Sequence, residues 1–349
     1  MNRAVNLKVV SLILVLLFWA ALLPEPALSE ESFFKGKTVR IVVGYPPGGG
    51  FDTFSRILAR HLPRYLPGNP STIVQNMPGA GSMAAANRVY AMQPGDGLTI
   101  VAFIYDAAFQ YFVGDPKVKF DPTKYQWLGE PTVGSVPATL FIRTDLPIRN
   151  FNDLKNSKKP VFLGGSGRGN LASIGPHFLK SLGLPIKPVL GYGGSAPVFA
   201  AIERKEVDGR FTSQESVQTR YRRFLDEGVL RPILAFGSDP RVKPFPGIAT
   251  IDDLGLDNKQ RQLAEFLIKT WRHLRLFAIP PGIPPKRLAI IREAFDKMLK
   301  DPKVIQDGNR QGVRISPSSW RKLEADIKEL SQAPPWIMEK YKELAGLKN

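Results

Sequence analysis

The sequence predicts an α/β protein with two lobes and a mostly parallel sheet in each lobe, and three observations support this fold class. The chain has 349 residues, enough for two domains with a sizeable core. Apolar runs of strand length alternate with segments of helix length, and helical connections between buried strands favour parallel pairing with right-handed crossovers. The order strand, glycine-rich loop, helix occurs in two separate blocks, although the residues themselves do not repeat.

The first block begins at residue 37. Its expected strands have buried, apolar centres and span 37–45, 71–77 and 98–104. Glycine-rich loops follow the first two strands, and they read PPGGG (46–50) and PGAGS (78–82). Each loop leads into a predicted helix, and the first helix has an apolar face formed by Phe51, Phe54, Ile57, Leu58 and Leu62.

The second block repeats this order of elements. Its expected strands span 159–165, 187–192 and 207–213. The loops SGRGN (166–170) and GGSAP (193–197) follow the first two strands and lead into helices. All four glycine-rich loops therefore lie at the carboxyl ends of strands, where open α/β sheets bind their ligands.

Two other segments, 139–154 and 228–238, look like strands that cross between the lobes. We therefore expect a discontinuous first lobe and a second lobe inserted into it. The expected bounds are 31–138 plus 236–349 for the first lobe and 139–235 for the second.

The end of the chain predicts helices. Ser316 followed by Pro317 has the pattern of a helix N-cap with proline at the first helical position. The last residues, WIMEKYKELAGLKN, predict an amphipathic helix that packs on a lobe.

Residues 1–29 have the pattern of a cleaved secretory signal peptide. Arg3 and Lys8 precede an uninterrupted apolar run, and Ala27 and Ser29 stand at the small-residue positions of a cleavage site. The alternative is a permanent membrane anchor, because the apolar run is long for a signal peptide. We expect cleavage after Ser29 and a periplasmic protein.

The chain contains no cysteine. The exported protein therefore has no disulfide, no thiolate zinc site and no thiol nucleophile. It also lacks the cysteine that would carry a lipid after the signal, so we do not expect a lipoprotein.

The formal net charge is +17. Such a charge suits nucleic acid, an acidic surface or an anionic ligand. Because the basic runs are short and the protein is expected outside the cytoplasm, we favour a solvated basic surface that attracts a small anion, with no nucleic-acid partner.

Motifs for cofactors and catalysis do not fit. No P-loop occurs, and the glycine-rich strings at 48–53 and 165–170 have Thr53 and Asn170 where a dinucleotide fingerprint needs its third glycine. The three histidines lie far apart in the sequence, and no nucleophile elbow is present. We therefore expect no cofactor, no metal site and no catalytic residue.

An exported hydrolase that uses Ser166, or Asp52 paired with Asp208, is the alternative. For Asp52 we favour a different role, as the acidic residue that the dipole prefers in the first turn of a helix.

Anion binding remains as the function that the loops support. Helix N-termini present unpaired N–H groups and attract negative charge, and glycine lets a ligand approach the backbone. If the lobes face each other, the four loops line one cleft. Hydroxyl groups of Ser82, Ser166 and Ser195 would add donors, and Arg168 would add a charge-assisted contact.

Several stretches resemble a known family. IVVGYPPGGGFDTFSRILARHL, IVQNMPGAGSMAAANRVYAMQPGDGLTI, FLGGSGRGN and GYGGSAPVFAAIERKEVDGRF are similar to the substrate-binding proteins of tripartite tricarboxylate transporters, the TctC or Bug family of periplasmic receptors. The resemblance covers most of the mature chain and is looser from residue 139 to 213.

The resemblance implies a Venus-flytrap fold, similar to type II periplasmic binding proteins, that closes on a small di- or tricarboxylate. It also implies delivery of this ligand to a membrane permease with a large and a small subunit. The implied ligand contacts on the first lobe are Tyr45, Pro47, Gly48, Gly49 and Asp52, and on the second lobe Ser166, Gly167, Asn170, Tyr192 and Gly193. Asp208 would shape the site, because like charges repel.

Three departures from the family pattern concern the ligand. Gly193 follows the tyrosine where the family often has a lysine, and Arg168 is bulkier than expected. Residues 103–112, which include Tyr105, are unusually aromatic. They form either an aromatic wall that favours a longer or aromatic carboxylate or part of the core.

The sequence thus predicts a monomeric receptor for an organic carboxylate and not an enzyme. A ligand-dependent partner of a sensor protein is a further alternative.

Overall fold

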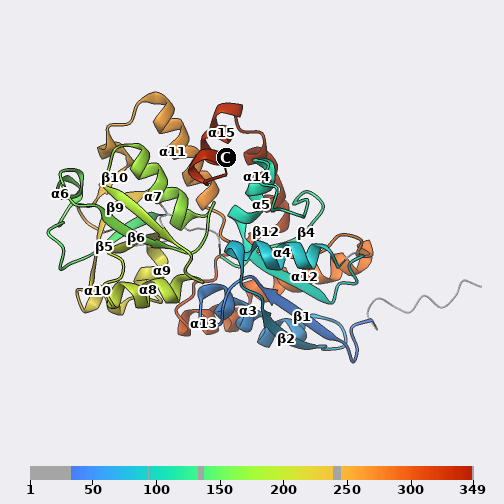
Figure 1. Ribbon diagram of the computed structural model, residues 1–349. Coiled ribbons are helices and arrows are strands. Elements are labelled where there is room, and N and C mark those ends of the chain that lie inside the picture. The colour runs from blue at the N-terminus through green and yellow to red at the C-terminus, as the bar shows by residue number, and fades with distance from the viewer. Residues whose placement is uncertain (1–32, 93, 133–136, 239–244, 348–349) are drawn as a thin grey trace, which may run out of the picture.

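The computed structural model describes residues 33–92, 94–132, 137–238 and 245–347. It shows two lobes side by side, each built on a six-stranded sheet covered by helices (Figure 1). The strands of both sheets are mostly parallel, as the sequence predicts.

The first sheet has the strand order β12-β4-β11-β3-β1-β2. Its strands are β1 (Thr38–Val43), β2 (Ser71–Asn76), β3 (Thr99–Ile104), β4 (Gln126–Glu130), β11 (Arg275–Ile279) and β12 (Ser318–Ser319). β1 pairs in parallel with β2 and β3, whereas β11 runs antiparallel to β3 and β4. This reversed strand carries its first residue to the edge where β1 and β3 end.

The second sheet has the strand order β10-β9-β5-β8-β6-β7. Its strands are β5 (Ala138–Arg143), β6 (Val161–Gly165), β7 (Ile186–Leu190), β8 (Gly209–Ser213), β9 (Leu230–Phe236) and β10 (Ala249–Thr250). β6 pairs in parallel with β7 and β8, and β5 runs antiparallel to β8 and β9.

Helices cover both sheets. Those packed on or next to the first sheet are α3 (Gly50–His61), α4 (Met83–Tyr90), α5 (Tyr105–Phe112), α12 (Pro285–Lys300), α13 (Pro302–Arg310) and α14 (Trp320–Ser331). The second lobe contains α6 (Phe151–Lys155), α7 (Leu171–Ser181), α8 (Ser195–Glu203), α9 (Gln214–Gln218) and α10 (Arg223–Asp226). Three short 3₁₀ helices span Leu62–Tyr65, Ala80–Ser82 and Ile251–Leu254.

Two helices connect the lobes. At the end of α11 (Asn258–Trp271), the ring of Trp271 packs against Phe211 of the second sheet. In the last helix, α15 (Pro335–Leu344), Tyr341 packs on Phe109 of α5, while the helix itself contacts α7 (Figure 1). The amphipathic C-terminal helix therefore packs against both lobes.

The two strands expected to cross between the lobes do not cross. β5 and β9 pair with each other along their whole length within the second sheet. β10 extends this sheet to Thr250, into the part of the chain expected in the first lobe. The chain enters the first sheet again only after α11, at Arg275. The apolar pattern marked both strands correctly but held no information about which sheet each one joins. The exact lobe bounds remain a prediction.

The helix predicted to begin after Ser316 is α14, and it begins later than expected, at Trp320. Ser316 forms a bridge with Thr132 instead of capping a helix, and its N–H donates to the carbonyl of Pro131 at 2.9 Å. Pro317 favours an extended residue before it, which suits this edge pairing. The cap of α14 is Ser319, whose hydroxyl accepts from the N–H of Lys322 at 3.3 Å.

The predicted signal peptide, 1–29, lies outside the described residues. Within the described ranges, no helix combines the length and the apolar character that crossing a membrane requires.

Candidate ligand-binding site

The four glycine-rich loops meet where the lobes face each other. A Cβ atom placed on Gly167 would lie 3.3 Å from the backbone nitrogen of Gly81. A Cβ atom on Gly193 would lie 3.4 Å from Cγ of Pro46. Each loop of one lobe thus packs closely against a loop of the other, because all four follow carboxyl ends of strands.

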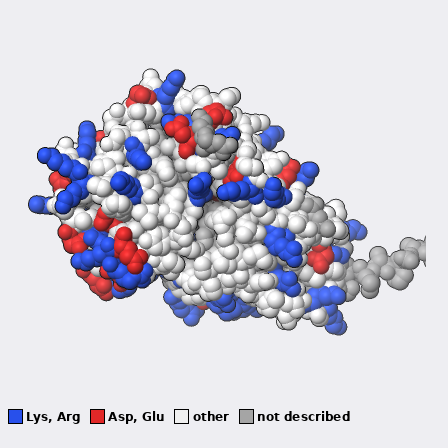
Figure 2. Space-filling model, in the orientation of Figure 1, with Lys and Arg blue, Asp and Glu red and all other residues white. Residues whose placement is uncertain are grey.

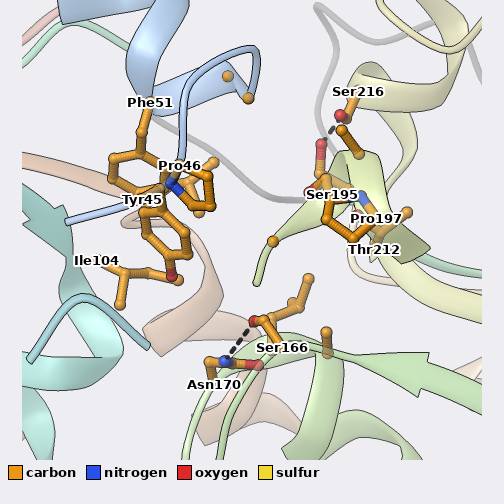
Figure 3. A pocket seen from close by; sticks show the side chains of 18 of the residues that line it. Tyr45, Pro46, Phe51, Ile104, Ser166, Asn170, Ser195, Pro197, Thr212 and Ser216 are labelled. Atoms are coloured by element: carbon orange, nitrogen blue, oxygen red, sulfur yellow. Dashed lines mark hydrogen bonds between the residues drawn. The ribbon is translucent and has the colours of Figure 1, made fainter. Parts of the chain in front are cut away.

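A cavity lies between the lobes and encloses about 830 Å³, counting its open mouth. Its walls come from the start of α3, the ends of β3 and β8, and the starts of α7, α8 and β11. Figure 3 shows Tyr45, Phe51 and Ile104 of the first lobe on one side, with Ser195 and Thr212 of the second lobe opposite.

The wall from the first lobe is largely apolar. The rings of Tyr45 and Phe51 stack with their centroids 4.5 Å apart. Ile104 and Leu274 extend this surface. Burial raises the pKa of the Tyr45 phenol well above its usual range, so this group stays neutral.

Asp52 holds the loop that begins this wall. Its carboxylate accepts hydrogen bonds from the Gly48 N–H at 3.0 Å, from Arg56 Nε at 3.0 Å and from Asn76 Nδ2 at 2.9 Å. Burial opposes ionisation, but these hydrogen bonds outweigh it and lower the pKa of Asp52. Asp52 is therefore the first-turn acid of α3, as expected, and does not line the cavity.

The start of α7 forms the floor of the cavity. Asn170 Nδ2 donates to Ser166 Oγ at 3.1 Å, and both residues line the cavity (Figure 3). The N–H of Leu171, the first residue of α7, donates to Asp106 Oδ2 of the first lobe at 3.2 Å. Part of this helix N-terminus is thus occupied by a carboxylate of the protein itself.

Arg210 supplies a positive charge from the second lobe. Its backbone lies in β8, and its Nη2 donates to Ser195 Oγ at 3.3 Å. The side chain is 5% exposed, and its Nε and Nη1 are buried without a hydrogen-bond partner. Burial lowers the pKa of Arg210 to about 10, so the guanidinium remains charged at neutral pH.

Arg275 supplies a second positive charge, from the first lobe. It begins β11 and lies opposite Ile104 at the end of β3. Its guanidinium stacks on Phe51 and Phe54, with its carbon 5.4 and 4.8 Å from the ring centroids. The Nε atom is buried without a partner, and burial lowers the pKa of Arg275 to about 10.

The structure brings six of the predicted site residues to the cavity: Tyr45, Pro47, Gly49, Ser166, Asn170 and Ser195. Three more belong to the loops at the interface without lining the cavity: Gly48, Gly167 and Gly193. The carbonyl oxygen of Gly48 instead accepts a hydrogen bond from Arg220 of the second lobe.

Four predicted residues besides Asp52 lie away from the cavity. The ring of Tyr105 is buried in the core, its centroid 5.0 Å from that of His273. Most of the aromatic stretch at 103–112 packs inside the lobe, whereas Tyr111 is exposed. Arg168 is exposed and donates to the carbonyl of Gly346 at 3.2 Å. Tyr192 packs on the second core, beside Gly164.

Asp208 lies at the opposite end of β8 from the cavity. It accepts from the N–H of Phe162 at 2.9 Å and faces Arg143 at 3.7 Å. It therefore does not pair with Asp52, which removes the basis for a carboxylate dyad.

A serine hydrolase also finds no support. Within the described ranges, the histidines bond elsewhere: His61 to Asp307, His177 to the carbonyl of Ser173, and His273 to Glu130. None is therefore hydrogen-bonded to Ser166. The described residues contain no cluster of His, Cys, Asp and Glu suited to a metal ion.

Sequence reasoning missed both cavity arginines. For Arg210 a signal existed, because it stands in a strand that leads to the cleft and alternates with the buried Phe211. For Arg275 no local signal existed, since its position depends on β11 running antiparallel to β3.

On the molecular surface, basic side chains are scattered and mixed with acidic ones. Figure 2 shows them mostly toward the edges of the visible face, around a middle region with few charges. On this face the basic side chains are therefore not gathered in one tract.

Two α/β lobes that meet around a cavity lined by glycine-rich loops define a solute-binding receptor of the Venus-flytrap kind. The chain matches the model of the tripartite tricarboxylate transporter family receptor over residues 55–335, and it belongs to this family.

Individual relatives agree with this assignment. The chain is 28% identical to a UPF0065 protein of Bordetella pertussis over 329 residues, which cover 91% of this chain and 94% of that protein. The solved periplasmic binding protein BugD shares the fold with a TM-score of 0.68 at 22% identity, covering 89% of this chain and 98% of BugD. A solved R. palustris protein with adipate has a TM-score of 0.67 at 20% identity, covering 89% of this chain and 97% of the other.

Proposed function

We propose that this protein is a periplasmic receptor that binds a small organic carboxylate between its lobes and delivers it to a tripartite tricarboxylate-type permease. The single observation that carries the ligand class is Arg210, a buried guanidinium that faces the cavity with two nitrogens lacking a partner. A buried charge is costly until an opposite charge pairs with it, and a planar carboxylate matches the guanidinium geometry. Adipate in the R. palustris structure agrees with this ligand class.

The transport role rests on the family and on the signal-peptide pattern at 1–29. A receptor of this kind has two states, open and closed, and the ligand favours the closed one. The partners are the large and small permease subunits.

Thermal unfolding of the ligand-stripped protein tests the ligand class. In a library of organic anions, we expect at least one carboxylate to raise the melting temperature in a concentration-dependent way. Mass spectrometry of that ligand after incubation should return it unaltered, whereas turnover would indicate an enzyme. If no organic anion stabilises the protein, the proposed function is wrong.

A further inference from the structure

The two cavity arginines belong to different lobes. Arg210 lies in the second sheet and Arg275 in the first, and both line the same cavity. A ligand in this cavity therefore meets one positive charge from each lobe.

Neither arginine forms an ion pair with a carboxylate within the described part of the chain. Nε and Nη1 of Arg210 and Nε of Arg275 are buried without a hydrogen-bond partner. Both side chains remain charged at neutral pH, because burial lowers their pKa values only to about 10. Arg210 is a buried charge and Arg275 a half-buried one, and each would be stabilised by a negative group.

Acidic and basic groups both lie near Arg275. Glu215 and Glu130 are acidic neighbours that raise the pKa of Arg275, and the Glu215 carboxylate also faces Arg314 at 3.6 Å. Arg220 of the second lobe lowers the pKa of Arg275. Because Arg275 has no ion pair of its own within the described residues, an anionic group of a ligand would be favoured beside it.

Each guanidinium lies beside further donors. The hydroxyl of Ser195 is 3.3 Å from Arg210 Nη2, and Thr212 lines the cavity next to it. Arg275 lies against the start of α3, since a Cβ atom on Gly50 would be 2.7 Å from its Nη2. The unpaired N–H groups of this helix start add to the attraction for an anion.

The remaining lining is mostly apolar. Besides the stacked rings of Tyr45 and Phe51, it includes Ile104 and Pro197 (Figure 3). Leu171 also lines the cavity. A polar substituent on the middle of a ligand would lose its hydration against such a surface, whereas a hydrocarbon or aromatic body would not.

We propose that Arg210 and Arg275 are the specificity-determining residues for one dianionic ligand with an apolar body, each arginine binding one acidic group. This inference rests on the proposed function and assigns the ligand's two ends to opposite lobes. The ligand thereby connects the lobes, so its second charge contributes to closure as well as to affinity.

Isothermal titration calorimetry tests this proposal. The probes are straight-chain dicarboxylates from succinate to sebacate and terephthalate, each compared with the monocarboxylate of the same skeleton. Wild-type protein should bind its best dicarboxylate roughly 10- to 100-fold more tightly than the matching monocarboxylate. Malate, with its hydroxyl group, should bind more weakly than succinate.

Three variants test which residues bind the two acidic ends of the ligand. Arg210→Gln and Arg275→Gln should each weaken dicarboxylate binding by roughly 10- to 100-fold and nearly abolish the advantage over the monocarboxylate. Arg168→Gln removes the same charge outside the cavity and should leave affinity unchanged. Melting temperatures check that all three fold.

The results separate this inference from the proposed function. If carboxylates bind but dicarboxylates and monocarboxylates bind wild-type protein equally well, the two-ended ligand is wrong while the receptor function stands. Loss of affinity in only one arginine variant would also overturn it. Failure of every carboxylate to bind would contradict the proposed function itself, and with it this inference.

Discussion

Asp106 carries a buried carboxyl group at the contact between the lobes. It begins α5, and its Oδ2 accepts from the N–H of Leu171 in the other lobe, while its Oδ1 is buried without a partner. Burial raises the pKa of Asp106 to about 7, although the hydrogen bond from Leu171 opposes this rise. Its titratable neighbours are the phenols of Tyr45, Tyr105 and Tyr341, which stay neutral because their own pKa values are raised.

Asp106→Asn should therefore change how stability depends on pH. The folded protein holds this proton up to about pH 7, whereas an unfolded aspartate releases it near pH 4, so wild-type stability falls as the pH rises between these values. The variant lacks this loss. We compare the free energies of unfolding in urea of the variant and of wild type. The variant's value minus the wild-type value should be about 2 kcal/mol higher at pH 8 than at pH 5. An equal difference at both pH values would show that Asp106 is ionised throughout.

Gly50→Ala should weaken ligand binding without destabilising the protein. The added methyl group would lie 2.7 Å from Arg275 Nη2, so the guanidinium must move, while alanine is a better helix former than glycine. We expect dicarboxylate affinity to fall roughly 3- to 10-fold, with the melting temperature unchanged or slightly higher.

The same substitution on an Arg275→Gln background serves as the control. There it should cost almost nothing, because its effect acts through Arg275. A full loss on that background would mean that the methyl group contacts the ligand directly.

At the scale of elements, the segment between α9 and α10 reaches across to the start of α3. Arg220 Nη1 donates to Thr53 Oγ1 at 2.7 Å, and its Nη2 donates to the Gly48 carbonyl. These hydrogen bonds join the second lobe to the first beside the cavity, and in the proposed receptor they would favour the closed arrangement.

Arg220→Ala should lower the affinity for the ligand by favouring the open arrangement. We expect a roughly 3- to 30-fold rise in the dissociation constant measured by calorimetry. Arg222→Ala is the matched control, because Arg222 is exposed and pairs with Asp226 on its own segment. Equal affinities of wild type and Arg220→Ala would show that this contact does not contribute to closure.

Local patterns in the sequence predicted most elements but not their partners. The strands before the glycine-rich loops were predicted because their apolar centres and the loops that end them are adjacent in the chain. The antiparallel β11 and the late return to the first lobe were not predicted, since pairing partners are set by packing between distant segments. The sequence therefore predicted the cleft between the lobes but not the position of Arg275 in it. Arg168 was predicted there because a basic residue in a glycine-rich loop resembles an anion contact.

At the scale of the whole molecule, the two lobes meet at more than the glycine-rich loops. The hydroxyl of Tyr341 in α15 donates to the Gly169 carbonyl at 3.3 Å, next to the floor of the cavity. Arg168 reaches from the same loop to the Gly346 carbonyl. The C-terminal helix and the residues that follow it are thus hydrogen-bonded to the loop that precedes α7.

A crystal structure of the protein with its tightest-binding dicarboxylate tests the central claim most directly. We predict closed lobes around the ligand, with one carboxylate hydrogen-bonded to the guanidinium of Arg210. A ligand bound outside the interlobe cavity, or bound inside it without contact to Arg210, would contradict this account.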